Sequence, residues 1–440
     1  MAKIAILGAG VSGLALARYL VQGGVSPSDL KIFESSSVAG GLCRSETVDG
    51  FTYDKSGGHI LFSKDKEAMD WMKEETGGPD AFDERNRQTK IRFEDRWVHY
   101  PFENGIGDLP DEANFECLAG YVHAWHKRLK DGSIAPDTFG KWVQWRFGDG
   151  IAKHFMDPYN EKIWKRDLDF LTSDWVAGRV PDAPIEDVIR AGIGIRTEGY
   201  THQSVFYYPS TGGFQAITDG MAARLEGCVH LNTPVQEVRQ QGEGVTVNGE
   251  SFDMCVSTLP LTYVPKMFPE VPADVAKAME ELEYNGIASI LVALDRAEHP
   301  DLSWIYLPHP SQGPANRVTY MSNYATLNAP EGKTSLMAEV TFRGGEQLPG
   351  EQLEKDVLAG FVNAGIMKAD EVLFTHRSSA AHAYVVFDAM YAKRREVALG
   401  WLQSIGVTPL GRFGRFEYDN SDQCVIKARE LAKSMLAKLA

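Results

Sequence analysis

Three glycines near the N-terminus have the spacing of a turn that binds a dinucleotide. Gly8, Gly10 and Gly13 form the pattern G-x-G-x-x-G in "KIAILGAGVSGLALARYL", between a short apolar run and a helical pattern. The first glycine permits a tight turn, the second lets the backbone approach a pyrophosphate, and the third lets the helix pack closely on the strand. The next apolar run, "LKIFE", ends at Glu34, whose carboxylate would accept hydrogen bonds from a ribose. Together these residues predict a dinucleotide-binding βαβ unit.

A second pair of glycines favours FAD over NAD as the dinucleotide. Gly40 and Gly41 follow Glu34 in "SSSVAGGLCRS", and Arg44 comes shortly after them. This spacing resembles the extension of FAD-containing oxidoreductases of the amine oxidase and glutathione reductase type. In those proteins a second loop lies along the pyrophosphate, whereas a domain that binds only NAD has no need of it. An ordinary flexible loop is the alternative interpretation.

Other candidate contacts of a flavin occur further along the chain. Gly58 and His59 lie in "DKSGGHILFS", where glycines would let the backbone approach a flat ring, although a lone histidine is often structural. Val235 lies in a run that we predict to be a strand on the adenine side of the FAD domain. Asp422 begins the last predicted helix, where a carboxylate is favourable and free N–H groups could hold the ribityl chain or O2 of the flavin.

The stretch "FMDPYNEKIW", residues 155–164, combines aromatic rings with an asparagine. Stacking of a nucleobase on an aromatic ring contributes roughly 1–3 kcal/mol, so this stretch could form one wall of a nucleotide pocket. The alternative is an aromatic helix face that is buried in a core. That alternative suits Phe155 better than Asn160, because a buried amide needs a hydrogen-bond partner.

The positions of these motifs predict an α/β fold with a discontinuous Rossmann-like FAD-binding domain. A chain of 440 residues is too long for one ordinary domain. We expect residues 1–65, 205–265 and 385–440 to form the FAD-binding domain. Helical spacing and many tryptophans predict a mostly helical substrate-binding insertion over 66–204. Alternating strands over 266–384 predict a second substrate lobe with a mixed sheet, and both insertions would cover the flavin.

The composition excludes several kinds of partner. The net charge of −15 disfavours nucleic acid and anionic lipid. No apolar run reaches the length of about 18 residues that a membrane-spanning helix needs. The five cysteines show no CxxC spacing, so we expect reduced, mostly buried thiols in a cytoplasmic protein without a metal site. An anionic substrate would have to be bound by locally placed arginine or lysine.

Further motifs are dispersed along nearly the whole chain. In chain order they are "GGHILFS", "WVHYPFENGI", "FMDPYNEKIW", "GRVPDAP", "FYYPSTGG", "WIYLP", "NRVTYMSNY" and "GRFGRFEY". Their shared order resembles that of the UDP-galactopyranose mutases, which are flavin-dependent nucleotide-sugar mutases, and is closer to the eukaryotic-type branch of that family.

The resemblance implies a reaction as well as a fold. Enzymes of this family use FAD to interconvert the pyranose and furanose forms of a UDP-sugar, here most simply UDP-galactopyranose and UDP-galactofuranose for cell-surface polysaccharides. N5 of the reduced flavin would attack the anomeric carbon and displace UDP. The reaction is an isomerisation without net redox change, and NADH or NADPH would be the reductant.

The resemblance also implies roles for individual residues. Arg179 and Arg317 would bind the diphosphate, Arg412 would lie near N1 and O2 of the flavin, and His59 would neighbour the ring. The tyrosines that would bind the phosphates are Tyr306, Tyr384 and Tyr418. The residues that would line the uridine and sugar pocket are Tyr100, Phe102, Phe155, Tyr159, Asn160, Trp164, Gln203 and Trp304.

Among the departures from the family pattern, Glu103 and Gln203 leave the substrate open. Glu103 stands in "YPFEN" where the family has "YPFQN", and Gln203 stands where an asparagine is expected near the sugar. These changes permit a different sugar or a different nucleotide. The alternative function is an FAD-dependent oxidase or desaturase of the protoporphyrinogen oxidase or amine oxidase type, and a third is a binding protein without catalysis. Family relatives form dimers or tetramers, and the sequence does not select between these homo-oligomers.

Overall fold

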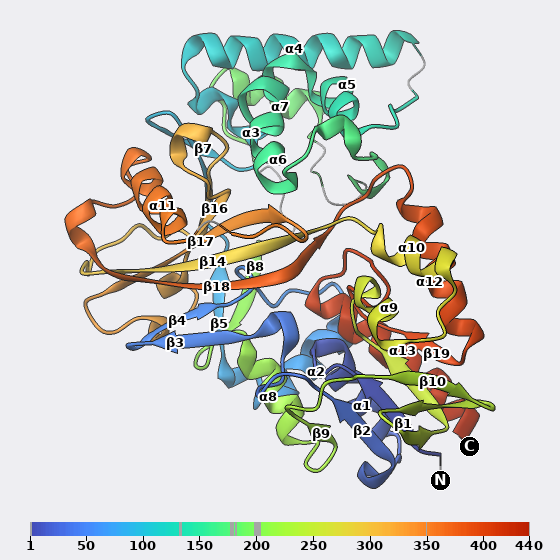
Figure 1. Cartoon of the computed structure of the whole chain (residues 1–440). Coiled ribbons are helices and arrows are strands. Elements are labelled where there is room, and N and C mark those ends of the chain that lie inside the picture. Colours follow the sequence, from blue (N-terminus) through green and yellow to red (C-terminus); the bar gives the residue numbers. More distant parts are fainter. Residues whose placement is uncertain are drawn as a thin grey trace.

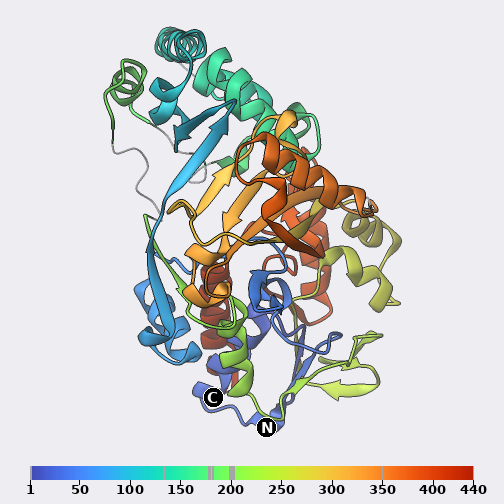
Figure 2. The ribbon, with the colours of Figure 1, turned by 90° about the vertical axis from the view of Figure 1, so that its left-hand side faces the viewer.

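The chain is arranged in three tiers (Figure 1). The tier nearest the two termini holds a parallel sheet with its helices, the middle tier is a long mixed sheet, and the third tier is helical (Figures 1 and 2). No helix in the described part of the chain has the length and apolar character needed to cross a membrane. This computed structural model describes residues 2–131, 134–176, 180, 183–197, 204–348 and 350–439.

A parallel sheet of five strands forms the first tier. In sheet order its strands are β19 (Val407–Pro409), β13 (Met254–Ser257), β1 (Ile4–Leu7), β2 (Leu30–Phe33) and β9 (Val229–His230), and α1 (Val11–Gln22) packs on α13 (Ser421–Leu439). Ile4 and Ile6 enter one apolar core, whereas Ala5 and Leu7 enter another, so both faces of β1 are buried. Such burial on both faces is typical of parallel sheets. The sheet joins segments from both ends of the chain, which confirms the predicted discontinuous Rossmann-like fold.

A seven-stranded mixed sheet forms the middle tier. In sheet order its strands are β18 (Val372–Val385), β14 (Tyr284–Leu294), β17 (Thr334–Arg343), β16 (Arg317–Tyr320), β15 (Trp304–Tyr306), β6 (Thr89–Phe93) and β7 (Arg96–His99). Its neighbouring strands are antiparallel except that β15 runs parallel to β6. β6 and β7 belong to the segment 66–204, which we expected to be mostly helical. They extend the sheet because apolar Ile91 and Phe93 stand at alternate positions of β6 and are buried together with Val98 of β7, as is Arg92 between them.

The third tier is built from helices of the same segment. They are α3 (Phe102–Gly105), α4 (Asp111–Asp131), α5 (Phe139–Ile151), α6 (Asp157–Trp164) and α7 (Ile185–Gly192). α5 bends at Gly148, whose φ of +76° is in the left-handed region. A β-carbon at Gly148 would lie 2.2 Å from the carbonyl oxygen of Gly120, so glycine is required where α5 meets α4. A π-helical turn over Ala152–Met156 then leads into α6.

The remaining elements connect the tiers or cover their edges. The strand pairs and triplet are β3 (Ser45–Val48) with β4 (Phe51–Asp54), β5 (Phe82–Asn86) with β8 (Val205–Pro209), and β10 (Val238–Gln241), β11 (Gly244–Val247) and β12 (Glu250–Phe252). The helices are α2 (Lys66–Thr76), α8 (Gln215–Ala223), α9 (Val264–Met267), α10 (Ala273–Glu280), α11 (Gln352–Asn363) and α12 (Tyr391–Ser404). The prediction of a strand at Val235 is wrong, because this residue precedes β10. The N–H groups of Gln236 and Glu237 donate to the side chain of Asn248 instead of to a neighbouring strand.

Candidate active site

A cavity of about 700 Å³ lies where the first tier meets the long sheet. Its walls come from the turn after β1, the loops 41–44 and 55–62, the end of β18 and the start of α13. Many residues singled out from the sequence line this cavity. They are Gly8, Gly10, Glu34, Gly41, Arg44, Gly58, His59, Trp304, Tyr306, Arg317, Tyr384, Arg412, Tyr418 and Asp422.

The two glycine loops pack against each other at one end of the cavity. Gly40 donates its N–H to the carbonyl oxygen of Ala9 at 2.8 Å, and a β-carbon at Gly41 would lie 3.1 Å from the α-carbon of Gly10. A β-carbon at Gly13 would lie only 2.1 Å from the carbonyl oxygen of Gly8, so this glycine serves the packing of α1 on the turn. The result is a wall of bare backbone at the N-terminus of α1, which suits a pyrophosphate.

Glu34 follows β2 at the edge of this wall. Its carboxylate accepts from the N–H of Ala9 at 3.0 Å and from the N–H of Ser36 at 2.9 Å. These bonds fix the carboxylate at the rim of the cavity, and each oxygen keeps a further lone pair for a ribose hydroxyl. Arg44 lies nearby and donates to the carbonyl oxygen of Gly41 at 3.3 Å.

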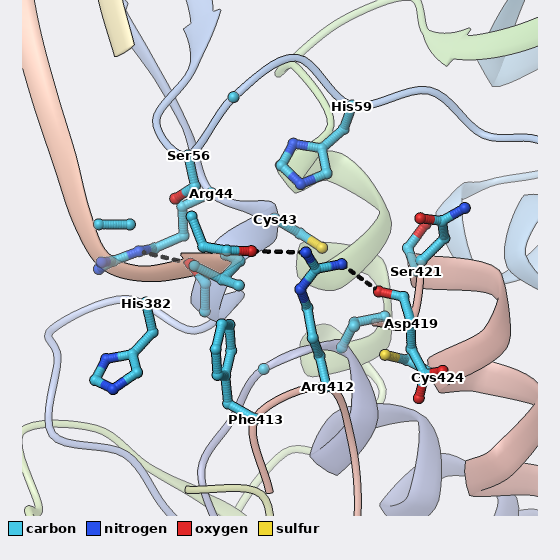
Figure 3. A pocket seen from close by; sticks show the side chains of 18 of the residues that line it. Cys43, Arg44, Ser56, His59, His382, Arg412, Phe413, Asp419, Ser421 and Cys424 are labelled. Atoms are coloured by element: carbon cyan, nitrogen blue, oxygen red, sulfur yellow. Dashed lines mark hydrogen bonds between the residues drawn. The ribbon is translucent and has the colours of Figure 1, made fainter. Parts of the chain in front are cut away.

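Arg412 places a positive charge in the middle of the cavity wall. Its guanidinium donates to the carbonyl oxygens of Asp419 and Ala383, each at 2.7 Å, and lies 4.3 Å from the ring centre of Tyr418. Figure 3 shows this guanidinium pointing toward His59. Asp422 lies in the first turn of α13, and burial raises the pKa of its carboxyl above the ordinary value.

His59 faces the cavity as a neutral ring. The ring stacks on Phe214 with ring centres 5.1 Å apart, and the backbone N–H of His59 donates to Asp54 at 3.0 Å. Burial lowers the pKa of His59 below its ordinary value, so the imidazole carries no charge at neutral pH. Its buried Nδ1 makes no hydrogen bond to the described part of the chain. Such an atom can serve a bound group.

Arg317 is held by a buried carboxylate that the sequence analysis missed. Nε of Arg317 donates to Glu339 at 2.7 Å, and Nη2 donates to the carbonyl oxygen of Gly58 at 3.1 Å. Glu339 is only 1% exposed and also accepts the N–H of Gly58 at 3.0 Å. The sequence did carry a signal of this contact. A glutamate within the apolar run "SLMAEVTF" indicates a buried acid, and a buried acid requires a partner. Arg317 and Glu339 are opposite each other on β16 and β17.

Tyr306 and Tyr384 lie near Arg317 and supply neutral donors. Tyr306 is directly opposite Arg317 in the β15–β16 pair, and Trp304 has its ring 5.8 Å from the guanidinium. Tyr384 and Tyr418 have ring centres 6.1 Å apart. Burial raises the pKa of Tyr306 and of Tyr384, so both phenols keep the protons that they can donate. Arg317 and these phenol donors, which we call the anion site, have the chemistry to bind an anion.

Aromatic residues of the third tier approach this anion site from above. The ring of Phe155 stacks between Phe102, at 4.8 Å, and Tyr159, at 5.2 Å. Tyr159 and Tyr100 then each contact Tyr306, at 5.1 and 5.3 Å between ring centres. These rings lie outside the cavity wall but reach it through Tyr306, so the stacking role expected for them stays a prediction.

The side chains of Asn160 and Trp164 form a hydrogen bond with each other within α6. The amide of Asn160 donates to the carbonyl oxygen of Met156 at 2.7 Å and accepts from Nε1 of Trp164 at 3.2 Å. Both side chains are buried, so their contact with a nucleotide stays a prediction. Arg179 and Gln203 lie outside the described residues.

The glycine loops, the carboxylate after β2 and the cavity together define a dinucleotide-binding flavoprotein. The family model of flavin-containing amine oxidoreductases matches residues 11–379, and the chain belongs to this family. It is similar to reduced UDP-galactopyranose mutase, with a TM-score of 0.91 and 27% identity over 100% of this chain and 96% of that one. This similarity confirms the resemblance seen in the sequence.

Two oxidases of known structure share the fold alone. A putative protoporphyrinogen oxidase from Exiguobacterium sp. 255-15 has a TM-score of 0.74 and 18% identity, and covers 99% of both chains. Putrescine oxidase has a TM-score of 0.63 and 18% identity, again over 99% of both chains. Membership of the family implies FAD, and the glycine wall, Glu34 and the buried Nδ1 of His59, which makes no hydrogen bond to the described residues, fit such a group.

Proposed function

We propose that the protein is a flavin-dependent nucleotide-sugar mutase that interconverts the pyranose and furanose forms of a UDP-sugar, with UDP-galactose the first candidate. One observation carries the proposal: a single cavity joins the glycine wall to Arg317 and its tyrosines. The similarity to UDP-galactopyranose mutase over the whole chain supports it.

The residues of the first tier would hold and tune the cofactor. The wall at Gly10 and Gly41 would take the pyrophosphate, and Glu34 would accept the ribose hydroxyls. When bound and reduced, the flavin supplies a nucleophilic nitrogen for the anomeric carbon of the sugar. Arg412 would place a cation beside the ring, whereas neutral His59 would add no charge there.

The residues around Arg317 would stabilise the leaving diphosphate. The guanidinium carries the positive charge that an overall charge of −15 makes necessary, and Glu339 fixes its position. Tyr306 and Tyr384 would donate to phosphate oxygens as negative charge develops on them. Because the diphosphate stays beside the sugar, it can recombine after the ring has reclosed. Arg179 would add a second charge, and NADH or NADPH would be the reductant.

The proposal is tested by comparing the reduced and the oxidised holoprotein. Each form is incubated anaerobically with UDP-galactopyranose, UDP-arabinopyranose and a dTDP-hexose, and the furanose products are separated by chromatography. We expect a furanose from at least one UDP-sugar with the reduced form and none with the oxidised form. No product from any of these sugars with the reduced form would reject the mutase. Steady consumption of O2 with an amine or a porphyrinogen would then favour the oxidase reading.

A further inference from the structure

Lys162 lies on α6, but its side chain points into the protein. The residue is only 9% exposed. Nζ donates to the carbonyl oxygen of Leu307 at 2.8 Å and to that of Ala315 at 3.2 Å. Within the described part of the chain it pairs with no carboxylate. A buried ammonium bound only by main-chain carbonyls is an unusual arrangement.

The two carbonyl oxygens belong to the hairpin that carries the anion site. Leu307 directly follows Tyr306 at the end of β15, and Ala315 stands two residues before Arg317 at the start of β16. The hairpin closes there, since the N–H of Leu307 donates to the carbonyl oxygen of Asn316 at 2.9 Å. Nζ of Lys162 therefore holds both arms of the hairpin beside their ligand-binding residues.

The same helix also carries Tyr159, one of the aromatic rings that approach from the third tier. Tyr159, one turn before Lys162, has its ring 5.1 Å from that of Tyr306 and stacks on Phe155. The carbonyl oxygen of Lys162 accepts from Oγ1 of Thr341 at 2.7 Å, which ties α6 to β17 as well (Figure 1). Lys162 thus lies between the aromatic rings and the strands of Arg317.

The burial of this ammonium is costly. Removal from water lowers the pKa of Lys162 to about 7, and the nearby charge of Lys165 adds to the shift. His309, at the start of the turn Pro310–Gln312 in the hairpin, also has its pKa lowered, first by burial and then by Lys162. An apolar side chain of similar size would avoid this cost. Added stability therefore does not explain why a lysine stands at this position. A role in fixing the geometry of the hairpin explains it better.

We propose that Lys162 is a positioning residue that sets the spacing between the aromatic stack at Tyr159 and the Arg317–Tyr306 strands, so that a nucleoside diphosphate binds to both at once. The inference rests on the proposed function, because it assigns the base to the rings and the diphosphate to the strands. Two half-sites bind a linked ligand tightly only when their spacing matches the linker.

The test measures binding to each half-site alone and to both half-sites at once. Uridine, methylenediphosphonate and UDP are titrated by calorimetry or ligand-observed NMR into the FAD-loaded wild type, Lys162→Met, Lys162→Gln and the control Lys153→Met. Lys153 lies one turn before α6 and its side chain is 64% exposed. We expect Lys162→Met to bind uridine and methylenediphosphonate like the wild type but UDP about tenfold more weakly, within the range of typical coupling between sites. Lys162→Gln keeps a donor and should recover part of the UDP affinity, and the control should match the wild type.

Equal affinity of Lys162→Met and wild type for UDP would overturn the inference. Parallel weakening of all three ligands would also overturn it, because that pattern indicates a general loss of structure. If Lys162→Met does not fold, the same comparison is made with Lys162→Gln, for which a UDP affinity equal to that of the wild type, or parallel weakening of all three ligands, would overturn the inference. A wild type that does not bind UDP would reject the proposed function and this inference together, whereas the other results reject the inference alone.

Discussion

Arg317 and Glu339 show how one side chain prepares another for binding. The carboxylate is buried and receives Nε of the guanidinium at 2.7 Å, while the arginine keeps 22% of its side chain exposed toward the cavity. The guanidinium is therefore fixed before an anion arrives. An arginine held in this way loses little conformational entropy on binding a diphosphate.

Replacement of Arg317 by lysine should separate binding geometry from charge. We expect kcat/KM to fall by roughly a hundredfold, because an ammonium cannot bridge Glu339 and a diphosphate with planar fork geometry. The melting temperature should change little, since the ammonium can still pair with Glu339. Arg317→Met should instead lower the stability by about 3–5 kcal/mol, because it leaves a buried carboxylate unpaired. Full activity of Arg317→Lys would contradict the assigned role.

Glu103 should make the stability depend on pH. Burial raises the pKa of this carboxyl from 4.5 to about 7, and the residue is 5% exposed. Between these two values the folded state binds more protons than the unfolded chain, so the free energy of unfolding falls as pH rises through that window. The loss is on the order of 3 kcal/mol. Glu103→Gln should melt well above the wild type at pH 8 and close to it at pH 5, and a difference that is the same at both pH values would contradict the assignment.

At the scale of elements, local patterns were predictable and long-range pairings were not. The glycine spacing and Glu34 identified β1, α1 and β2, because each signal lies within one short segment. The partnership of Arg317 with Glu339 depends on the register of β16 on β17, and that of Lys162 depends on where α6 meets the hairpin. The apolar run around Glu339 indicates a buried acid but does not identify its partner, and nothing local marks Lys162 as buried, so both partnerships were missed.

The turn between β1 and α1 allows a direct test of cofactor binding. A β-carbon at Gly10 would meet only the α-carbon of Gly41, at 3.9 Å, so Gly10→Ala should fold but should place a methyl group on the cavity wall. We expect this variant to retain much less FAD, measured as flavin absorbance per protein. The matched control is Gly400→Ala on α12, where no atom lies within 4 Å of the new carbon, and it should keep its FAD and gain up to about 1 kcal/mol of stability. Normal FAD content in Gly10→Ala would show that the pyrophosphate does not lie on this wall.

At the scale of the whole molecule, the proposed cofactor site is assembled from distant parts of the chain. The cavity wall includes residues near position 10, positions 258–263, positions 379–384 and positions 411–424. The sequence predicted this discontinuity from the motifs at the two ends. It did not predict that β6 and β7 continue the long sheet, because strand pairing across more than two hundred residues leaves no local signal.

Removal of FAD should therefore lower the stability of the whole fold. A ligand present at 100 times its Kd stabilises the folded state by about 2.7 kcal/mol, so the stripped protein should melt several degrees below the holoprotein. The shift should reverse when FAD is added back and should depend on FAD concentration. Identical melting curves with and without FAD, measured by calorimetry, would contradict a cofactor site whose walls belong to two tiers.

The central claim is that the bond between the anomeric carbon and the diphosphate breaks and re-forms within this cavity. Positional isotope exchange tests it most directly, with UDP-galactose that carries heavy oxygen in the bridge between the sugar and the β-phosphate. With the reduced holoprotein we predict that the label moves into the non-bridging positions of the β-phosphate, and with the oxidised holoprotein that it stays in the bridge. A label that stays in the bridge while the reduced protein is saturated with UDP-galactose would contradict the account.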